Sequence, residues 1–253
     1  RVAGTIADLT ITEDSGSTSL GLSGIGYVAG PANESNQVLT YKVTGVPPSS
    51  LGTIYLADGS TVVSANANYT IAEIRGMQFK AAPDAAGSAS LTFTVTDDGT
   101  TAGLASPQSL SEVLTITVAG VNDAPIQTGG TVQDLSVASD AGLTSFGLGN
   151  VSYGPGGGAD EATQALTYSV TAVPSASFGT IYLADGVTVV AANTNYTISE
   201  IRGMQFRPTS SATGSAAFSF SVADNGVTGG RSDPRTLSET INISVRSNTQ
   251  PIL

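Results

Sequence analysis

The clearest pattern along this chain is an alternation of apolar and polar residues with a period of two. Leu91, Phe93 and Val95 alternate with threonines, and Leu114, Ile116 and Val118 do the same further on. Strict alternation predicts β-strands that turn one face to a core and the other to solvent. The same alternation returns later in the chain at Phe218, Phe220, Val222, Ile241, Ile243 and Val245.

That return is part of an internal duplication. The block GTIYLADG begins at Gly52 and again at Gly179, and EIRGMQF begins at Glu73 and again at Glu200. Both blocks are offset by 127 positions, as from Gly52 to Gly179. A period this long indicates duplicated domains and not a solenoid. Near the amino end the offset is one residue shorter, so the second copy carries one extra residue, which we place in a surface loop over residues 154–158.

The remaining apolar runs of the first copy predict further strands. We expect them over residues 6–11, 20–25, 38–46, 53–56, 69–71 and 76–80, with one helical turn over residues 71–75. About seven or eight short strands per copy is the count of a Greek-key sandwich. Between the copies, Asn122-Asp123 favours a turn and Pro125 fixes the backbone. The sequence therefore predicts an all-β chain of two tandem Greek-key β-sandwiches, over residues 1–123 and 124–253.

Composition then excludes several classes of function. The chain contains no Cys, no His and no Trp, which excludes disulfides, thiolate nucleophiles and imidazole chemistry. Its net charge of -11 repels nucleic acid and anionic membranes and favours cations as partners. No apolar run is long enough for a membrane span, and the first residues do not resemble a signal peptide. We expect neither nucleic acid binding nor membrane insertion.

Three short motifs suggest a family. Val121-Asn122-Asp123-Ala124-Pro125 follows the last strand of the first copy, and FTVTDDG and FSVADNG stand at the ends of the penultimate strands. In a duplicated module, these motifs resemble the cadherin-like repeats arrayed in giant bacterial surface adhesins. The resemblance covers essentially the whole chain, twice. It implies a cadherin-like or immunoglobulin-like sandwich and an extracellular rod stiffened by Ca²⁺, whose modules are mostly spacers.

The resemblance also implies a set of calcium ligands. In cadherins the upper module contributes a Glu after its first strand, an acidic residue before its penultimate strand and the Asn-Asp of the linker. The lower module contributes acidic residues from its B–C and F–G loops. In this sequence the matching positions are Glu13, Asp84, Asn122, Asp123, Asp160, Glu161 and Asp224. The acidic B–C loop is thinner here than in the family, which implies a dissociation constant of roughly 10⁻⁴ to 10⁻³ M.

The duplication adds an observation of its own. Three acids of the first copy align with uncharged residues of the second: Glu13 with Ser139, Asp84 with Ser211, and Asp123 with Thr249. Loss of one shared ion explains all three changes. We therefore expect one ion between the modules and none after the second. The first copy's own Asn33, Glu34, Asp97 and Asp98 would face a preceding module.

Plainer interpretations exist for several of these residues. Asp97-Asp98-Gly99 and Asp224-Asn225-Gly226 are also ordinary turn sequences, so both the turn and the ligand interpretation stay open. Arg75 beside Glu73, repeated in the second copy, favours a structural ion pair over a ligand site. The paired acids lie in turns or the linker and lack the aromatic-lined cleft of a glycosidase. We expect no enzymatic activity.

The function that these observations favour is a structural stalk or spacer of a secreted bacterial surface adhesin or extracellular fibre. Its partners would be neighbouring repeat modules of the same or adjacent chains, at the cell surface. A second hypothesis is a binding module that recognises a polysaccharide or a protein receptor through a sandwich face or the loop over residues 154–158. A third is a filament subunit whose termini pair with neighbouring chains.

Overall fold

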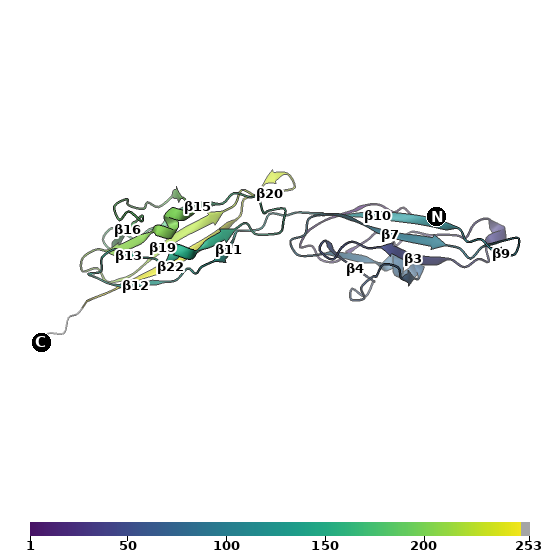
Figure 1. Ribbon diagram of the computed structural model, residues 1–253, viewed down its shortest axis with the longest axis horizontal. Coiled ribbons are helices and arrows are strands. Elements are labelled where there is room, and N and C mark those ends of the chain that lie inside the picture. Colours follow the sequence, from purple (N-terminus) through teal and green to yellow (C-terminus); the bar gives the residue numbers. More distant parts are fainter. Residues whose placement is uncertain (249–253) are drawn as a thin grey trace. The chain divides into compact units, whose positions relative to one another are not determined.

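The computed structural model describes residues 1–248, and the chain divides into two compact units. Unit 1 comprises residues 1–121 and 158–160; unit 2 comprises residues 122–157 and the chain from residue 161 onward. The regular secondary structure of each unit consists almost entirely of strands, which are joined by turns and loops (Figure 1). The all-β class predicted from the alternation is thereby confirmed.

Unit 1 is a sandwich of a five-stranded and a three-stranded sheet. The larger sheet has the order β1 (Leu9–Thr12), β10 (Ser109–Ala119), β7 (Gly87–Thr96), β3 (Thr40–Gly45), β5 (Asn68–Tyr69). The smaller has the order β2 (Thr18–Ser19), β6 (Gln78–Ala81), β4 (Gly52–Tyr55). β1 runs parallel to β10, and the other pairs are antiparallel. A hairpin of β8 (Thr100–Thr101) and β9 (Leu104–Ala105) and the short helix η1 (Ala32–Glu34) complete the unit.

Unit 2 repeats this arrangement. Its five-stranded sheet has the order β12 (Leu135–Ala138), β22 (Thr236–Arg246), β19 (Gly214–Ala223), β15 (Thr167–Ala172), β17 (Thr194–Tyr196). Its three-stranded sheet has the order β13 (Thr144–Ser145), β18 (Gln205–Pro208), β16 (Gly179–Tyr182). A pair of β11 (Ile126–Gly129) with β14 (Ser152–Gly154), a hairpin of β20 (Val227–Thr228) with β21 (Arg231–Ser232), and the short helix η2 (Leu148–Asn150) complete it.

Each core lies between its two sheets, where the alternation placed it. In unit 1, Phe93 and Leu114 from the larger sheet meet Ile54 and Phe79 from the smaller one, and all four are buried. The apolar residues named for the second copy are buried in the same way. The repeated glycine that opens GTIYLADG has a packing reason, because a Cβ at Gly52 would overlap the ring of Phe79.

The helical turn expected near residue 71 is α1 (Ile71–Gly76), and α2 (Ile198–Gly203) is its copy. Each begins with a capping box, in which Thr70 accepts from the Glu73 amide while the Glu73 carboxylate accepts from the Thr70 amide. These backbone and hydroxyl hydrogen bonds lower the pKa of Glu73. In both copies the glutamate of EIRG completes the capping box and the glycine of EIRG is the last residue of the helix.

Two expectations need correction. Residues 20–25 do not form a strand, because Gly21 adopts a positive φ of 73° and the Ile25 amide closes a turn on Leu22. Their apolar side chains are nevertheless buried. Arg75 and Glu73 do not pair with each other. Arg75 donates to the Ile25 carbonyl from Nε (2.9 Å) and Nη2 (2.6 Å), whereas Glu73 caps the helix.

Candidate functional site

The main cluster of buried polar side chains in unit 2 lies where the chain enters the unit, and we call it the entry site. It consists of Asn122, Asp123, Glu161, Gln164 and Asp224. Asn122, Glu161 and Asp224 are each buried, with exposed fractions of 3%, 3% and 6%. Buried ionisable groups require partners, so the hydrogen bonds of this cluster decide what it can do.

Asp224 follows the end of β19 and organises the loop behind it. Its Oδ1 accepts hydrogen bonds from the amides of Gly226 (2.9 Å) and Arg235 (3.0 Å). The equivalent residue of unit 1, Asp97, accepts in the same way from Gly99 (3.0 Å) and Gln108 (2.9 Å). The turn interpretation of these aspartates therefore holds in both units, for one of the two carboxylate oxygens.

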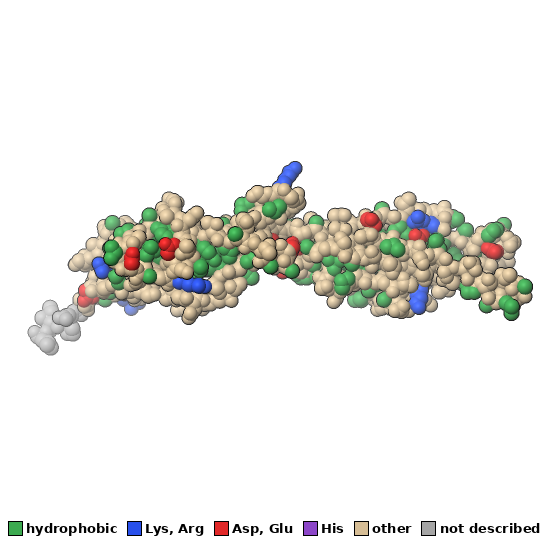
Figure 2. All heavy atoms as spheres, turned by 45° about the horizontal axis from the view of Figure 1, so that its top comes forward, with side chains coloured by type: hydrophobic (Ala, Val, Ile, Leu, Met, Phe, Trp, Pro, Cys, Tyr) green, Lys and Arg blue, Asp and Glu red, His purple; other side chains and the backbone are tan. Residues whose placement is uncertain are grey.

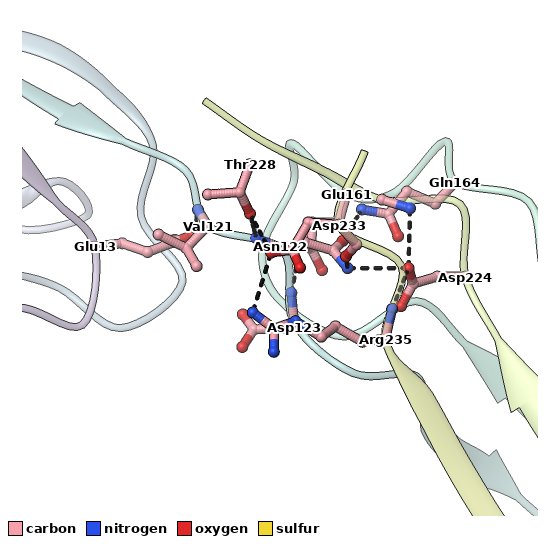
Figure 3. Close-up of polar contacts among 11 residues, drawn as sticks. Glu13, Val121, Asn122, Asp123, Glu161, Gln164, Asp224, Thr228, Asp233 and Arg235 are labelled. Carbon is pink, nitrogen blue, oxygen red and sulfur yellow. Dashed lines mark hydrogen bonds and ion pairs between the residues drawn. The ribbon is translucent and has the colours of Figure 1, made fainter. Parts of the chain in front are cut away.

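Asn122 is the residue around which the entry site is built (Figure 3). Its Nδ2 donates to Asp224 Oδ1 (2.9 Å) and to the Asp233 carbonyl (2.8 Å). Its Oδ1 accepts from Gln164 Nε2 (2.6 Å), and its backbone amide donates to Thr228 Oγ1 (2.9 Å). The linker asparagine is thus a fixed part of unit 2, held by the loops that follow β19 and precede β15.

Asp123 and Glu161 bring two more carboxylates to the same end of the unit. The Asp123 amide donates to Glu161 Oε1 at 2.7 Å. Both side chains approach Gly157, whose Cβ position would lie 3.0 Å from Asp123 Oδ2 and would overlap Glu161 Oε2. Glycine at 157, with a φ of 59°, therefore leaves the space into which both carboxylates point.

The chemistry of this donor set fits a hard cation. Ca²⁺ takes six to eight oxygen ligands and prefers carboxylates, amide carbonyls and water. Asp224 Oδ2 is buried and has no hydrogen-bond partner in the described chain. Asp123, Glu161 and Asp224 would supply carboxylate oxygens and Asn122 or the surrounding backbone would supply neutral ones. The neighbouring cation, Arg235, pairs with Asp233 at 3.0 Å.

The other predicted ligands lie in unit 1. Glu13 is buried and accepts a hydrogen bond from the Val121 amide. Asp84 is exposed, adopts a positive φ of 52°, and has a carboxylate oxygen within 4.8 Å of one from Asp14. Asp160 is exposed, and a Cβ at Gly120 would overlap its Oδ2.

Sequence reasoning missed several residues at these positions. Asp14 was overlooked because Glu13 alone matched the motif. Gln164 carries no charge, yet the duplication shows it, because Gln37 stands 127 positions earlier. Thr228 and Asp233 bind Asn122 through a hydroxyl and a backbone carbonyl, and no sequence motif indicates either contact. Thr249, which aligns with Asp123, lies outside the described residues.

Comparison with solved structures finds cadherin ectodomains. The chain of the protocadherin γB7 EC3-6 cis-dimer structure is 17% identical, and the match covers 97% of this chain and 50% of that chain at a TM-score of 0.35. Mouse protocadherin-24 EC1-3 is 14% identical, and the match covers 97% of this chain and 70% of that chain at a TM-score of 0.37. Drosophila N-cadherin EC1-4 is 15% identical, and the match covers 96% of this chain and 48% of that chain at a TM-score of 0.36. The chain therefore spans half the length of the first of these structures.

No protein-family model and no curated protein matches the chain. Among residues 1–248, no helix is both long and apolar enough to cross a membrane.

Proposed function

We propose that this chain is a pair of non-enzymatic extracellular spacer modules, of the kind found in the stalk of a bacterial surface adhesin, and that its entry site binds Ca²⁺. The observation that carries the calcium proposal is Asp224. One of its oxygens is committed to the loop, and the other is buried without a hydrogen-bond partner in the described chain.

A cation explains why such a group is tolerated. An isolated buried carboxylate costs several kcal/mol of desolvation, and fixed neighbouring carboxylates repel one another. The backbone amides on Oδ1 offset part of that cost. A bound Ca²⁺ would offset the rest by coordinating Oδ2 together with oxygens of Asp123 and Glu161. Asp97, the counterpart in unit 1, is only half-buried and has less need of such an ion.

The spacer proposal is supported by what the two copies share. The repeated blocks serve the fold: glycine makes room for a core ring, EIRG builds a capped helix, and the repeated arginine binds a backbone carbonyl. On the face shown in Figure 2, the charged side chains are few and scattered. Such a surface suits a module that separates other parts of a protein.

The calcium proposal is tested by unfolding the chain in CaCl₂ and in chelator. For a dissociation constant of roughly 10⁻⁴ to 10⁻³ M, about 10 mM Ca²⁺ would stabilise unit 2 by about 1.4 to 2.7 kcal/mol. Asp224→Asn removes the charge and keeps an oxygen for the loop amides, so we expect the calcium response to disappear. Asp97→Asn, the matched change in unit 1, is the control and is expected to retain it.

Failure would be plain in either of two results. Equal stability of the wild-type chain with Ca²⁺ and with chelator would show that these acids only form turns. An unchanged calcium response in Asp224→Asn would place the ion elsewhere. A parallel measurement addresses stiffening. Because Asp123 lies only two residues after Val121, where the first segment of unit 1 ends, we expect small-angle scattering to report a narrower range of conformations with Ca²⁺ than with chelator.

A further inference from the structure

The outer face of the three-stranded sheet carries side chains that neither the core nor the entry site uses. In unit 1, Ile54 of β4 and Phe79 of β6 are buried, so the residues that alternate with them face outward. On that side Thr53 pairs with Lys80 across the two strands, and Tyr55 lies two residues further along β4. Tyr55 is half-buried and Lys80 is exposed. We call Thr53, Tyr55 and Lys80 the outer-face site.

The outer-face site of unit 1 is hollowed. The hollow has a volume of about 250 Å³, and its lining includes Thr53, Tyr55, Lys80 and Pro83. A second hollow, of about 230 Å³, adjoins it and shares Gly52 and Thr53 with it. Pockets for drug-sized ligands measure about 300 to 1,000 Å³. Each hollow therefore suits a smaller group, such as one residue of an oligosaccharide.

The second copy keeps this set of side chains and its charge. Its members are Thr180, Tyr182 and Arg207, each 127 positions further on, and Thr180 again pairs with the cation across the strands. Of the nine basic residues of the chain, only two positions are basic in both copies. One holds Arg75 and Arg202, which donate to backbone carbonyls and serve the fold. The other is the cation of the outer-face site.

The polar ends of these side chains have no work inside their own units. Within residues 1–248, the hydroxyls of Tyr55 and Tyr182 make no hydrogen bond, whereas the Tyr69 hydroxyl accepts from a backbone amide. The Lys80 ammonium forms neither an ion pair nor a hydrogen bond with any described residue. Arg207 lies over the Tyr182 ring, with its guanidinium carbon 5.5 Å from the ring centroid. An exposed cation–π contact is weak, so this guanidinium is free to turn to a ligand.

The chemistry of the site fits a carboxylated sugar. A tyrosine ring offers an apolar surface to the C–H face of a pyranose, and the threonine hydroxyl offers a hydrogen bond. A lysine or arginine beside them makes a charge-assisted hydrogen bond to a carboxylate. In a chain of net charge -11, a positive charge that both copies keep without an ionic partner favours an anionic ligand.

The backbone of β4 argues against a peptide as the ligand. A peptide that adds a strand to a sheet needs an edge with free backbone groups. The outer side of β4 is already occupied, because the Val63 amide donates to the Ile54 carbonyl (2.9 Å) and the Leu56 amide donates to the Thr61 carbonyl (2.9 Å). Recognition at this site therefore depends on side chains, which favours a sugar.

We propose that the outer-face site of each unit binds a uronic acid residue of an acidic polysaccharide. The sugar packs on the ring of Tyr55 or Tyr182, and its carboxylate pairs with Lys80 or Arg207. The hydroxyl of the neighbouring threonine bonds a sugar hydroxyl. This role goes beyond the spacer and calcium roles, and it uses no residue of the entry site.

The experiment titrates the full chain with a trimer of galacturonic acid and, as the uncharged match, with the methyl ester of that trimer. Both titrations are made in chelator and followed by the NMR shifts of backbone amides. Because one sugar residue has few atoms, we expect a dissociation constant of roughly 1 mM for the acid, and binding of the ester at least about fivefold weaker. The shifts are expected on β4 and β6 and on β16 and β18.

Paired variants separate the two contacts. Lys80→Gln combined with Arg207→Gln is expected to weaken binding of the acid to the level of the ester. Tyr55→Ala combined with Tyr182→Ala is expected to weaken binding of both ligands, and the matching Phe variants, which keep the rings, are expected to retain most of it. Lys42→Gln removes an exposed lysine outside the hollow and is the charge-matched control. Each variant is checked for an unchanged melting transition.

Each outcome bears on this proposal separately from the calcium one. Asp224→Asn leaves the outer-face site intact and is expected to keep sugar binding. Absence of saturable shifts up to about 20 mM trimer overturns the proposal, as do shifts confined to other strands. Equal binding of the acid and the ester removes the role of the cation. A tri-glutamate peptide that binds as tightly as the trimer shows a site for any carboxylate and overturns the sugar as ligand.

Discussion

Replacing Asn122 with alanine tests whether the linker asparagine is a structural part of unit 2. The substitution removes one buried amide group that bonds Asp224, the Asp233 carbonyl and Gln164. It leaves the backbone amide free to keep its bond to Thr228. The change therefore measures the contribution of the Asn122 side chain alone, without disturbing the backbone contact.

The expected cost follows from those three bonds. A neutral hydrogen bond contributes about 0.5 to 1.5 kcal/mol and one to a charged group about 1.5 to 3 kcal/mol, which together give about 2.5 to 6 kcal/mol. We expect the lower half of that range, about 2.5 to 4 kcal/mol, because Asp224 keeps its two backbone donors. Such a loss is a large fraction of the stability of a typical domain.

The assay is urea denaturation combined with native-state hydrogen exchange, which reports the two units separately. Amides of β19 and β22 are expected to lose protection, and those of β7 and β10 are expected to keep it. Asn225→Ala is a matched control, since its Oδ1 accepts one exposed bond from the Ala165 amide, and about 0.5 to 1.5 kcal/mol is expected. A loss below about 1 kcal/mol for Asn122→Ala, or an equal loss of protection in both units, would refute the reasoning.

Two further changes test the sandwich itself. Phe220 is fully buried, and its ring centroid lies 5.9 Å from that of Phe218 and 6.3 Å from that of Tyr153. Phe220→Ala is therefore expected to lower the unfolding free energy by about 3 to 5 kcal/mol in urea denaturation. A loss below about 1 kcal/mol would mean that the strand faces were wrongly assigned. Thr197→Ala removes the cap of α2 and is expected to cost about 0.5 to 2 kcal/mol at neutral pH. Hydrogen bonds from Thr197 lower the pKa of Glu200, so the contribution of this cap to stability is complete above the unfolded pKa of about 4.3 and is lost as pH falls through the folded pKa. The difference in unfolding free energy between Thr197→Ala and wild type should therefore shrink in acid. A difference that stays constant with pH would contradict the cap.

Periodicity predicted the core because the period of two is a direct consequence of strand geometry. Every alternating apolar residue named from β7, β10, β19 and β22 is buried. The segment 20–25 failed for an equally physical reason. Its apolar residues are buried, but Gly21 at positive φ breaks the extended backbone, and burial alone does not distinguish a strand from a packed turn.

The sequence predicted those residues of the candidate site that carry a charge or belong to a recognisable motif. Asn122, Asp123, Glu161 and Asp224 do cluster in unit 2, and the cadherin resemblance named all four. Gln164 and the Asp233 carbonyl were missed because an amide or a backbone oxygen becomes a partner only through folding. Arg75 was assigned the wrong partner because neighbours in a helix sequence are easier to read than a carbonyl on another segment.

The turn interpretation and the ligand interpretation of Asp224 are compatible, because they concern different oxygens of its carboxylate. Oδ1 holds the amides of Gly226 and Arg235 and the amide group of Asn122, and these three donors fix the carboxylate plane. With the plane fixed, the direction of Oδ2 is also fixed, so the cation binding that we propose would cost little further conformational entropy at this side chain. In Asp97 the same two backbone amides fix the plane. The turn therefore fixes the orientation of each carboxylate, and the deeper burial of Asp224 is the reason why the calcium proposal concerns unit 2 and not unit 1.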